Sequence, residues 1–327
     1  AFLKGRELLR QAYYDLVHHL TFASILPASP LAFLGKPFVA GPLGGAQEAP
    51  HPLVVSLPLR SRIAVMRQKL GRKMIEKISL AGLVYRRSSY CLGATQESVK
   101  KLHELGARRV GLSVQSGLSP SDLAKFKSRT QSVDDQRRPL RVLIASRMIF
   151  WKGVDLAIKA VAGARAQGLE CVVEISESGP EERRLRALVA ELKLEDQVTF
   201  LGRLPGHDNF LGVLSRADVL LHPAISESFG QVCLESLACG VPVICLDWGG
   251  PGLIVNDDCG YPVEPGSRDV VISRLADALI SCQQDRLEGK PCQRALHEQA
   301  ASFSWERLIH SADGAYAAID LTDHAKV

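Results

Sequence analysis

The sequence predicts an α/β protein with two lobes, each built around a doubly wound parallel sheet. The 327 residues exceed one typical domain, and a hydrophobic content of 46% is sufficient for two cores. In the second half, apolar runs typical of strands buried on both faces alternate with helical patterns as far as about Asp285. Such alternation is the signature of a parallel sheet covered by helices on both faces.

A polar segment without periodicity, residues 128–139, predicts a linker between the lobes. We expect an N-terminal lobe over residues 1–127, a C-terminal lobe over 140–302, and a final helical segment over 303–327 that returns to the first lobe. The net charge has opposite signs on the two sides of the linker. Residues 1–138 carry 22 Lys+Arg and 9 Asp+Glu, net +13, which leaves 18 basic and 26 acidic residues, net −8, for the remainder.

The strands of the first lobe are predicted at residues 15–19, 38–40, 89–92 and 110–114, after a helix-like opening segment. In the second lobe, an apolar strand at 140–146 leads into a loop with Arg147 and Lys152, and then a helix over 156–165 that Asp155 would cap. A strand at 218–222 leads to a helix that begins at Gly230 and ends by Gly240, and Val243–Leu246 forms the next strand.

Two carboxylates, Glu227 and Glu235, stand eight positions apart around the turn at Gly230. A helix N-terminus offers unpaired N–H groups and a positive dipole end, so this turn suits an anion. Glu235 lies roughly 7 Å further along the helix axis. Because a carboxylate accepts hydrogen bonds from two neighbouring hydroxyls, the pattern predicts a diphosphate at the helix tip, with a sugar at one carboxylate and a ribose at the other. The alternative is two solvated side chains, which the flanking strands disfavour.

Arg147 and Lys152 follow a strand whose carboxyl end faces the ligand crevice of an open α/β sheet. Positive charge there would stabilise a bound diphosphate and the phosphate that leaves during transfer. Lys152 supplies a point charge, whereas Arg147 can bind two oxygens at once. Taken alone, two cations five residues apart are also explained as solvated surface.

A family resemblance joins these elements. Residues 222–251 (HPAISESFGQVCLESLACGVPVICLDWGGP) resemble the donor-binding signature of retaining glycosyltransferases of family 4, also called glycosyltransferase group 1, which have the GT-B fold of two facing Rossmann-like lobes. Residues 146–160 (SRMIFWKGVDLAIKA) are similar to the Arg-…-Lys-Gly diphosphate clamp of that family. Residues 176–185 and 198–205 resemble its segments near the nucleotide base, although Glu177 replaces the first glycine.

The resemblance implies a retaining, metal-independent transfer from a nucleotide-diphosphate sugar, with no cofactor. Glu227, Arg147 and Lys152 would be the catalytic residues. Glu227 would position the donor sugar and Glu235 the ribose. The full donor-binding set that the resemblance implies is Arg147, Lys152, Gly202, Glu227, Ser228, Phe229, Gly230, Gln231 and Glu235.

The N-terminal lobe departs from the family pattern. GT-B lobes of this kind usually begin with a strand and a glycine-rich loop, so the resemblance implies that the first strands of this lobe lie outside the sequence. Residues 41–45 (GPLGG) stand where the family often has a histidine, and no acceptor-side catalytic histidine can be assigned. The remaining acceptor-side candidates are His18, His19, Gly44 and Gly45, although a histidine on an apolar strand is usually structural.

Residues 60–77 predict a basic amphipathic helix. Its cations are Arg60, Arg62, Arg67, Lys69, Arg72, Lys73 and Lys77, against the single carboxylate of Glu76. Apolar residues recur at helical spacing from Ile63 to Ile78. The helix could bind an anionic membrane, pack its apolar stripe on the lobe, or bind nucleic acid, for which no aromatic-interleaved module is present. The first option predicts a cytoplasmic protein, peripheral on the cytoplasmic membrane face, with a lipid-linked or envelope-glycan acceptor.

Several classes are excluded or left as alternatives. Eight cysteines without a C-x-x-C pair, including Cys171, Cys233 and Cys245 in predicted buried elements, indicate reduced core thiols. No Asp-x-Asp argues for a metal, no apolar run approaches the length of a membrane span, and no Gly-x-Gly-x-x-Gly follows a predicted strand as an NAD enzyme requires. The alternatives left open are an inert or regulatory nucleotide-sugar-binding protein with a defective N-lobe, and a GT-B nucleotide-sugar epimerase.

Overall fold

The computed structural model describes residues 1–20, 24–57, 59–130 and 138–319. Residues 131–137 of the predicted linker, residues 320–327 of the predicted C-terminal segment, and the side chain of Arg60 lie outside the described residues. The chain packs as two compact units. Unit 1 comprises the described parts of residues 1–48, 58–117 and 305–327, and unit 2 those of residues 49–57 and 118–304. The main part of unit 2 thus begins at residue 118, before the predicted linker, and unit 2 also includes residues 49–57.

Unit 1 has a four-stranded parallel sheet in the order β1-β2-β3-β4. Its elements are α1 (Phe2–Gln11), β1 (Val17–His19), η1 (Pro30–Phe33), β2 (Phe38–Leu43), α3 (Leu59–Ile78), α4 (Ala81–Arg87), β3 (Tyr90–Gly93), α5 (Gln96–Glu104), β4 (Val110–Leu112) and α14 (Trp305–Ala317). All four predicted strands are present. The strand predicted to end at residue 40 continues to Leu43, because Leu43 still pairs with Gly93 of β3 in spite of the intervening Gly41 and Pro42.

Unit 2 has a six-stranded parallel sheet in the order β10-β9-β8-β5-β6-β7. Its elements are α2 (His51–Val55), α6 (Pro120–Lys127), β5 (Leu140–Ala145), η2 (Phe150–Lys152), α7 (Val154–Ala166), β6 (Cys171–Ser176), α8 (Glu182–Glu191), β7 (Val198–Gly202), α9 (His207–Leu214), β8 (Val219–His222), α10 (Gln231–Ala238), β9 (Val243–Leu246), α11 (Pro251–Ile254), β10 (Gly260–Val263), α12 (Arg268–Leu287) and α13 (Gln293–Ala301). The predicted strand Val243–Leu246 agrees with β9 at both ends.

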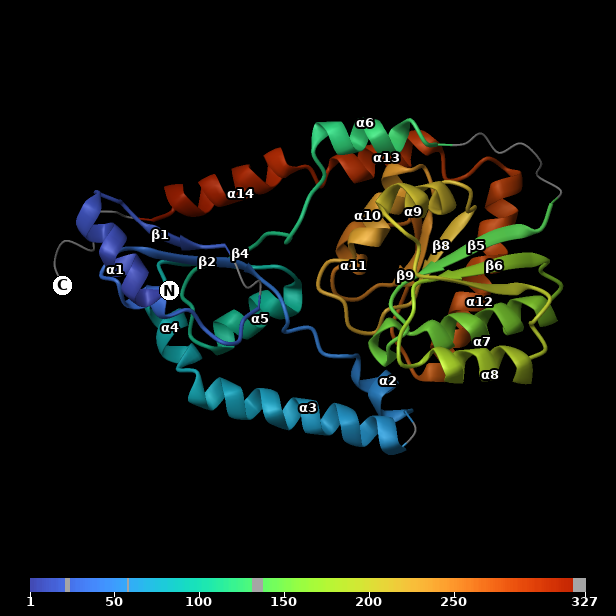
Figure 1. Ribbon diagram of the computed structural model, residues 1–327, viewed down its shortest axis with the longest axis horizontal. Coiled ribbons are helices and arrows are strands. Elements are labelled where there is room, and N and C mark those ends of the chain that lie inside the picture. The colour runs from blue at the N-terminus through green and yellow to red at the C-terminus, as the bar shows by residue number, and fades with distance from the viewer. Residues whose placement is uncertain (21–23, 58, 131–137, 320–327) are drawn as a thin grey trace. The chain divides into compact units, whose positions relative to one another are not determined.

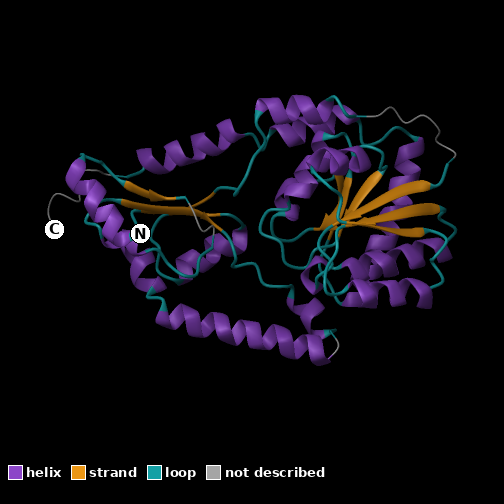
Figure 2. Ribbon diagram, viewed as in Figure 1, coloured by secondary structure: helices purple, strands orange, loops and turns teal. Residues whose placement is uncertain are grey.

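Helices cover both faces of the unit 2 sheet, as Figures 1 and 2 show. On one face α7 packs against α8 and α12, and on the other α10 packs against α13 and α6. The strands of this sheet contribute fully buried side chains such as Leu143, Leu220 and Ile244, which explains why their sequences are apolar without alternation. The α/β class with parallel sheets, which the sequence predicts, is therefore confirmed.

The N-terminus of α7 differs from the sequence prediction. Gly153, not Asp155, is the N-cap residue, with φ of +64°. Asp155 lies inside the first turn, where it is buried and accepts a hydrogen bond of 2.5 Å from Arg268. Asp155 therefore does not cap its own helix and instead accepts a hydrogen bond from Arg268 of α12.

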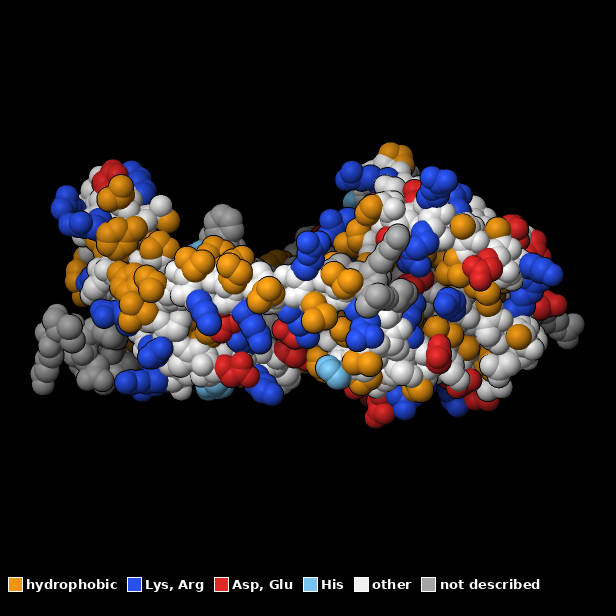
Figure 3. All heavy atoms as spheres, turned by 90° about the horizontal axis from the view of Figure 1, so that it is seen from below, with side chains coloured by type: hydrophobic (Ala, Val, Ile, Leu, Met, Phe, Trp, Pro, Cys, Tyr) orange, Lys and Arg blue, Asp and Glu red, His pale blue; other side chains and the backbone are white. Residues whose placement is uncertain are grey.

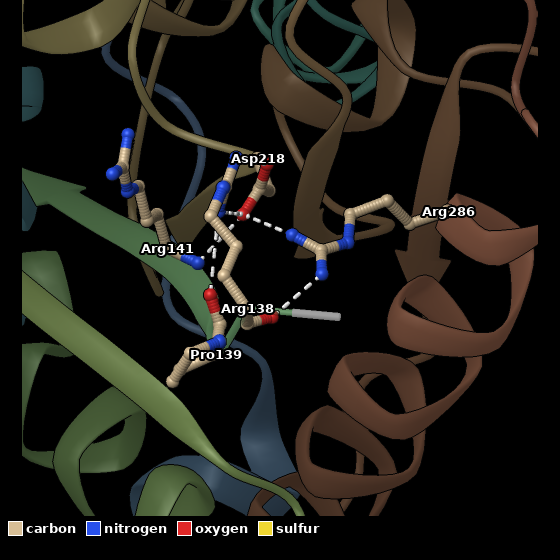
Figure 4. A network of polar contacts seen from close by, with 5 residues as sticks. All are labelled: Arg138, Pro139, Arg141, Asp218 and Arg286. Atoms are coloured by element: carbon tan, nitrogen blue, oxygen red, sulfur yellow. Dashed lines mark hydrogen bonds and ion pairs between the residues drawn. The ribbon is translucent and has the colours of Figure 1, made fainter. Parts of the chain in front are cut away.

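Asp218 ties three segments together at the amino ends of β5 and β8. Its carboxylate accepts two hydrogen bonds from Arg138, of 2.6 and 2.7 Å, and one of 2.8 Å from Arg286. It also accepts a 2.7 Å hydrogen bond from the backbone N–H of Arg141 (Figure 4). Asp218 and Arg286 are both almost fully buried. This network stands at the opposite strand ends from Arg147 and Glu227, and its role is structural.

Seven of the eight cysteines are buried and unpaired, as the sequence predicts. Burial raises the pKa of the Cys91 and Cys282 thiols to about 12. Only Cys292 is exposed.

Helix α3 carries an exposed apolar stripe. Ile63, Met66, Leu70, Met74 and Ile78 follow each other at intervals of three or four residues and are 46–75% exposed. The opposite side of the helix carries buried Val65, and Glu76 on that side forms an ion pair of 2.9 Å with Lys101 of α5. Figure 3 shows the hydrophobic side chains gathered along the helix among Lys and Arg. The alternative that this stripe packs on its own lobe is therefore wrong. None of the helices, as far as they are described, is both long and apolar enough to cross a membrane.

Candidate donor site

The strand order of the unit 2 sheet reverses at the boundary between β5 and β8. From β5 the chain continues to β6 and β7 on one side, and β8 returns on the other side of β5, paired at Val142 and Val219. In an open α/β sheet the loops at such a point diverge at the carboxyl ends of the strands and leave a crevice there. The loop with Arg147 and Lys152 follows β5, and the loop with Glu227 follows β8. The topology therefore brings the two sequence motifs to one place.

These two loops pack closely through a glycine. A Cβ atom at Gly153 would lie 2.2 Å from the carbonyl oxygen of Pro223, and the residue has φ of +64°. The backbone N–H of Ile225 donates a 2.9 Å hydrogen bond to the carbonyl of Trp151. Only glycine meets both the conformation and the space at position 153.

Lys152 and Glu227 form an ion pair through Nζ and Oε2. Both side chains are about four-fifths buried, at 18% and 19% exposure. Burial by itself raises the pKa of the Glu227 carboxyl, but His222 and the Lys152 charge together lower that pKa to about 2. Glu227 is therefore a carboxylate at every physiological pH, and it holds a cation in the ligand-free protein.

The turn after Glu227 has the geometry of an anion site. Gly230, with φ of +83°, is the N-cap of α10, and Gln231 is the first residue of the helix. The segment Gly249–Gly250 supports the turn from behind, since the N–H of Gly250 donates a 3.0 Å hydrogen bond to the carbonyl of Glu227. A Cβ atom at Gly249 would lie 2.4 Å from the same oxygen. Both glycines thus allow close approach of the two backbones.

Two residues of the predicted donor set differ in exposure. Phe229 is buried and packs edge-on against Phe303, with ring centroids 6.5 Å apart. Its side chain therefore anchors the turn from inside the unit. Ser228 is partly exposed beside it.

A pocket of about 660 Å³ opens beside α10. It is lined by Ala145, Ser176, Glu177, Arg203, Leu204, Pro205, Gly206, His207, Phe210, Gln231, Val232 and Glu235. Burial raises the pKa of Glu235, while His207, whose Nε2 lies 3.4 Å from Oε1 of Glu235, lowers it in part. The His207 ring stacks on Phe210 at an interplanar angle of 23°. Glu235 thus lies in the second turn of α10 and lines a pocket that includes neither Lys152 nor Glu227.

The loop at Glu177 has a left-handed backbone conformation, which is usual for glycine. Glu177 has φ of +83°, and its N–H donates a 2.8 Å hydrogen bond to the carbonyl of Gly202, which itself has φ of +69°. Ser176 beside it is buried, and its hydroxyl has no hydrogen-bond partner among the described residues. Glu177 therefore has a backbone conformation that glycine adopts readily, and it adds a carboxylate to the pocket wall.

Arg147 lies on the exposed part of the loop after β5, which is anchored by a 3.0 Å hydrogen bond from the N–H of Met148 to the carbonyl of Ser178. No hydrogen bond or ion pair joins it to Glu227 or Glu235 in the described residues. Its guanidinium is therefore available to a ligand at the crevice.

In unit 1, His18 has both ring nitrogens engaged. Nε2 bonds the carbonyl of Gly41 at 2.9 Å, so Nδ1 accepts the 2.6 Å hydrogen bond from the Tyr316 hydroxyl of α14. Burial lowers the pKa of His18, so the ring is neutral and joins the first strand to the last helix. This geometry favours a structural role for His18.

The other acceptor-side candidates lie at the carboxyl ends of β1 and β2. His19 is the last residue of β1 and is partly exposed, and burial lowers its pKa. Gly45, with φ of +84°, donates a 3.0 Å hydrogen bond to the side chain of buried Gln47. Gly44 approaches Gln115, whose side-chain nitrogen would lie 2.6 Å from a Cβ atom there.

Sequence reasoning assigned no role to His222 or His207. His222 ends the apolar strand β8, and its Nε2 lies 3.7 Å from Oε2 of Glu227. The polar residue at the end of an apolar run was a visible signal, whereas His207 contacts Glu235 from the start of α9, a helix distant from α10 in the sequence. Within the described residues, no group of three or more His, Cys, Asp or Glu side chains is arranged to hold a metal ion.

Comparison with known proteins identifies the family and the fold of the chain. The family model described as glycosyl transferases group 1 matches residues 127–293, just over half of the chain. The chain is 29% identical over 181 residues to the phosphatidylinositol N-acetylglucosaminyltransferase gpi3 subunit of Schizosaccharomyces pombe. That match covers 55% of this chain and 38% of the relative, so the chain spans well under two thirds of this curated protein.

Solved structures resemble nearly the whole chain. The apo form of the lipopolysaccharide outer core galactosyltransferase WaaB superposes with a TM-score of 0.68 and 15% identity, covering 97% of this chain and 79% of that one. HepE from Anabaena, solved in complex with UDP, superposes with a TM-score of 0.62 and 18% identity, covering 97% and 82%. At these identities the likeness establishes a shared fold.

Proposed function

The chain belongs to the group 1 glycosyl transferase family and has the GT-B fold, and from that premise we propose that it transfers a sugar from a nucleotide-diphosphate sugar with retention at the anomeric carbon. The observation that carries the proposal is the Lys152–Glu227 pair at the strand-order reversal, beside the N-terminus of α10. A cation, a carboxylate and a helix N-terminus together provide for a diphosphate and a sugar at one point.

Three groups would hold the diphosphate. Lys152 and Arg147 approach from the loop after β5, and the N–H groups at the start of α10 approach from the loop after β8. As the bond to the anomeric carbon breaks, negative charge grows on the leaving phosphate, and these fixed positive groups stabilise it more than they stabilise the bound donor. This accounts for catalysis by cations and backbone, and we propose that the reaction needs neither a metal nor a cofactor.

The two carboxylates would divide the rest of the donor between them. Glu227 would accept hydrogen bonds from hydroxyls of the donor sugar, while Glu235 would accept those of the ribose in the adjoining pocket. The pocket that contains Glu235 and the loop of residues 203–207 is large enough for a nucleoside and is open to solvent. HepE was solved with UDP, which is consistent with a nucleotide in a fold of this kind.

We also propose that the acceptor is lipid-linked or an envelope glycan, reached at the cytoplasmic face of a membrane. The exposed stripe of α3 is flanked by exposed Arg67, Lys73 and Lys77. An exposed apolar stripe between cations fits a helix that lies in the interface of an anionic bilayer. Two of the similar proteins are named for a phosphatidylinositol and for a lipopolysaccharide substrate.

The donor proposal is tested by a thermal-shift screen of nucleotide-diphosphate sugars, because a ligand that binds only the folded state raises the unfolding midpoint. A shift with at least one donor, followed by release of its nucleotide diphosphate on addition of a suitable acceptor, is the expected result. Folded protein that responds to no donor of the panel would overturn the transferase proposal. Binding without any turnover would instead favour the regulatory alternative.

The membrane proposal is tested by sedimentation with phosphatidylserine-containing vesicles. We expect binding at low salt that weakens as salt rises, because surface charges are screened over about 8 Å at physiological ionic strength. Replacing Arg67, Lys73 and Lys77 with Gln should release the protein without changing donor affinity. The matched control removes three exposed cations of unit 2, Arg183, Lys290 and Arg294, and should leave binding intact. Wild-type protein that stays in the supernatant at low salt would contradict the proposal.

A further inference from the structure

His222 is a buried histidine at the carboxyl end of β8, one of the two strands at the strand-order reversal. It is 2% exposed and pairs in register with Cys245 of β9. Its Nε2 atom has no hydrogen-bond partner among the described residues. A buried polar atom that lacks a partner destabilises the folded state, so its presence calls for an explanation in terms of function or of a group that arrives later.

The unpaired atom faces the candidate donor site. Nε2 of His222 lies 3.7 Å from Oε2 of Glu227, which is the oxygen that Lys152 also contacts. Two side chains that can donate a proton to a hydrogen bond, one from β8 and one from the loop after β5, thus converge on a single carboxylate oxygen. Lys152 contacts that oxygen in the ligand-free protein, and Nε2 of His222 lies about 0.5 Å beyond the upper end of the hydrogen-bonding range.

The donor would change this balance. Under the proposed function Lys152 turns from Glu227 to the diphosphate, because a phosphate oxygen offers the ammonium a stronger partner than a carboxylate already shared with a sugar. Glu227 then loses the group that holds it, at the moment when its orientation toward the sugar hydroxyls matters for the reaction. A neutral imidazole with its proton on Nε2 is a donor already beside that oxygen, and burial lowers the pKa of His222, which keeps the ring neutral.

We propose that His222 is a positioning residue for the donor sugar: its Nε2–H donates to Oε2 of Glu227 once Lys152 has turned to the diphosphate, and so fixes the carboxylate toward the sugar. The inference rests on the proposed function and adds to it an exchange of partners, in which Glu227 leaves Lys152 and bonds His222 (the hand-over). It explains why a histidine is buried without a partner directly under the site, where a leucine would pack without that cost.

Three substitutions separate this role from packing. His222→Gln can place an amide N–H near the position of Nε2, His222→Asn reaches only the position of Nδ1, and His222→Leu fills the space without a donor. The probes are UDP and GDP, together with UDP-glucose, UDP-N-acetylglucosamine and GDP-mannose. Their affinities are measured by calorimetry, and turnover is followed as release of the nucleotide diphosphate.

We expect the Asn and Leu variants to lose about 10- to 100-fold in kcat, the Gln variant to stay within about three-fold of wild type, and all three to bind the free nucleotide diphosphate as wild type does. Wild-type turnover in the Leu and Asn variants would overturn the proposal. Equal impairment of Gln and Leu, or a joint loss of nucleotide affinity, would show a packing role and overturn it as well.

The Gln–Asn comparison decides the question if the Leu variant does not fold. The test also stands apart from that of the proposed function. Wild-type protein that binds none of the five probes contradicts the donor site itself, whereas binding and turnover that are insensitive to residue 222 contradict only the hand-over.

Discussion

Lys152 and Glu227 form a partly buried ion pair between two loops that leave neighbouring strands of the unit 2 sheet. Each partner of the pair is the residue expected to bind a different part of the donor, the diphosphate for Lys152 and the sugar for Glu227. The ligand-free site is therefore electrically balanced, and neither charge is left buried without a partner. Donor binding would exchange one set of partners for another, so the net gain in affinity is smaller than the new contacts alone suggest.

Replacing Glu227 with Gln should reduce transfer by roughly 10- to 150-fold, which corresponds to the loss of one charged hydrogen bond. Affinity for the free nucleotide diphosphate should not fall, because the Glu227 side chain would contact the sugar and Lys152 would no longer have to leave a carboxylate. Turnover of the donor and calorimetry with the nucleotide diphosphate measure the two effects. A variant that transfers at the wild-type rate would reduce Glu227 to a partner of Lys152 in the folded state.

The double substitution Arg147→Ala with Lys152→Ala should weaken binding of the nucleotide diphosphate by about 3–6 kcal/mol, from 1.5–3 for each charged hydrogen bond lost. The control is Lys290→Ala with Arg294→Ala, which removes the same charge from exposed side chains of the same unit. If the two double variants bind the nucleotide diphosphate equally well by calorimetry, the phosphate site lies elsewhere.

The two carboxylates should affect stability with opposite dependence on pH. The pKa of Glu227 is lowered to about 2 from its ordinary 4.5, so it stabilises the folded protein above pH 4.5 and this contribution is lost as the pH falls toward 2. The pKa of Glu235 is raised by burial, so its ionisation costs stability once the pH exceeds 4.5. At pH 7, Glu227→Gln should therefore lower the free energy of unfolding and Glu235→Gln should raise it.

Urea unfolding at several pH values between 3 and 8 measures both effects. The difference for Glu235→Gln should shrink as the pH falls to 4.5, the difference for Glu227→Gln should shrink only below pH 4.5, and the two differences should have opposite signs at neutral pH. Glu235→Gln should also weaken nucleotide binding, since the ribose would lose a charged acceptor. Variants whose unfolding curves shift in the same direction at pH 7 would contradict the electrostatic assignment.

Asp218→Ala should destabilise unit 2 by about 3–5 kcal/mol, because it leaves the buried guanidinium of Arg286 with an uncompensated charge. The matched control is Asp208→Ala, whose carboxylate pairs with Lys125 and Arg129 but is largely exposed. That substitution should leave the urea midpoint unchanged, since exposed pairs are screened by water. Similar midpoints for both variants would mean that the Asp218 network adds nothing to stability.

Glu177→Gly should raise the free energy of unfolding by about 1 kcal/mol, because the left-handed conformation at φ of +83° is costly for a residue with a Cβ atom and free for glycine. The control Glu174→Gly, inside β6, should be destabilising, because glycine loses more backbone freedom in a strand. Thermal unfolding of the two variants compares them directly. A fall in the midpoint of Glu177→Gly would show that the side chain itself stabilises the loop.

The elements that the sequence predicts best are those with a local cause. Val243–Leu246 is apolar at every position because both faces of the sheet are covered, and Gly230 and Gly240 mark the two ends of α10 within their own segment. Elements with a distant cause are predicted less well. β2 runs through Gly41 and Pro42, beyond its predicted end at residue 40, because Leu43 still pairs with β3.

The same distinction applies to single residues in the candidate site. The spacing of Glu227 and Glu235 is visible in the sequence, but the partner of each is not. His222 reaches Glu227 because a loop turns back over the strand end, and His207 reaches Glu235 from the start of a different helix. Asp155 binds Arg268, which lies more than a hundred residues away, so its local pattern suggested a cap that the structure does not contain.

Because seven cysteines are buried, Cys292 is the cysteine that thiol reagents can reach in the folded protein. The thiolate of a cysteine attacks a maleimide, and burial denies the seven core thiols both ionisation and access to the reagent. One fluorophore can therefore be placed at the start of α13, a helix that packs against α10, without any cysteine being removed. Cys292 thereby provides a specific labelling site for following donor binding in solution.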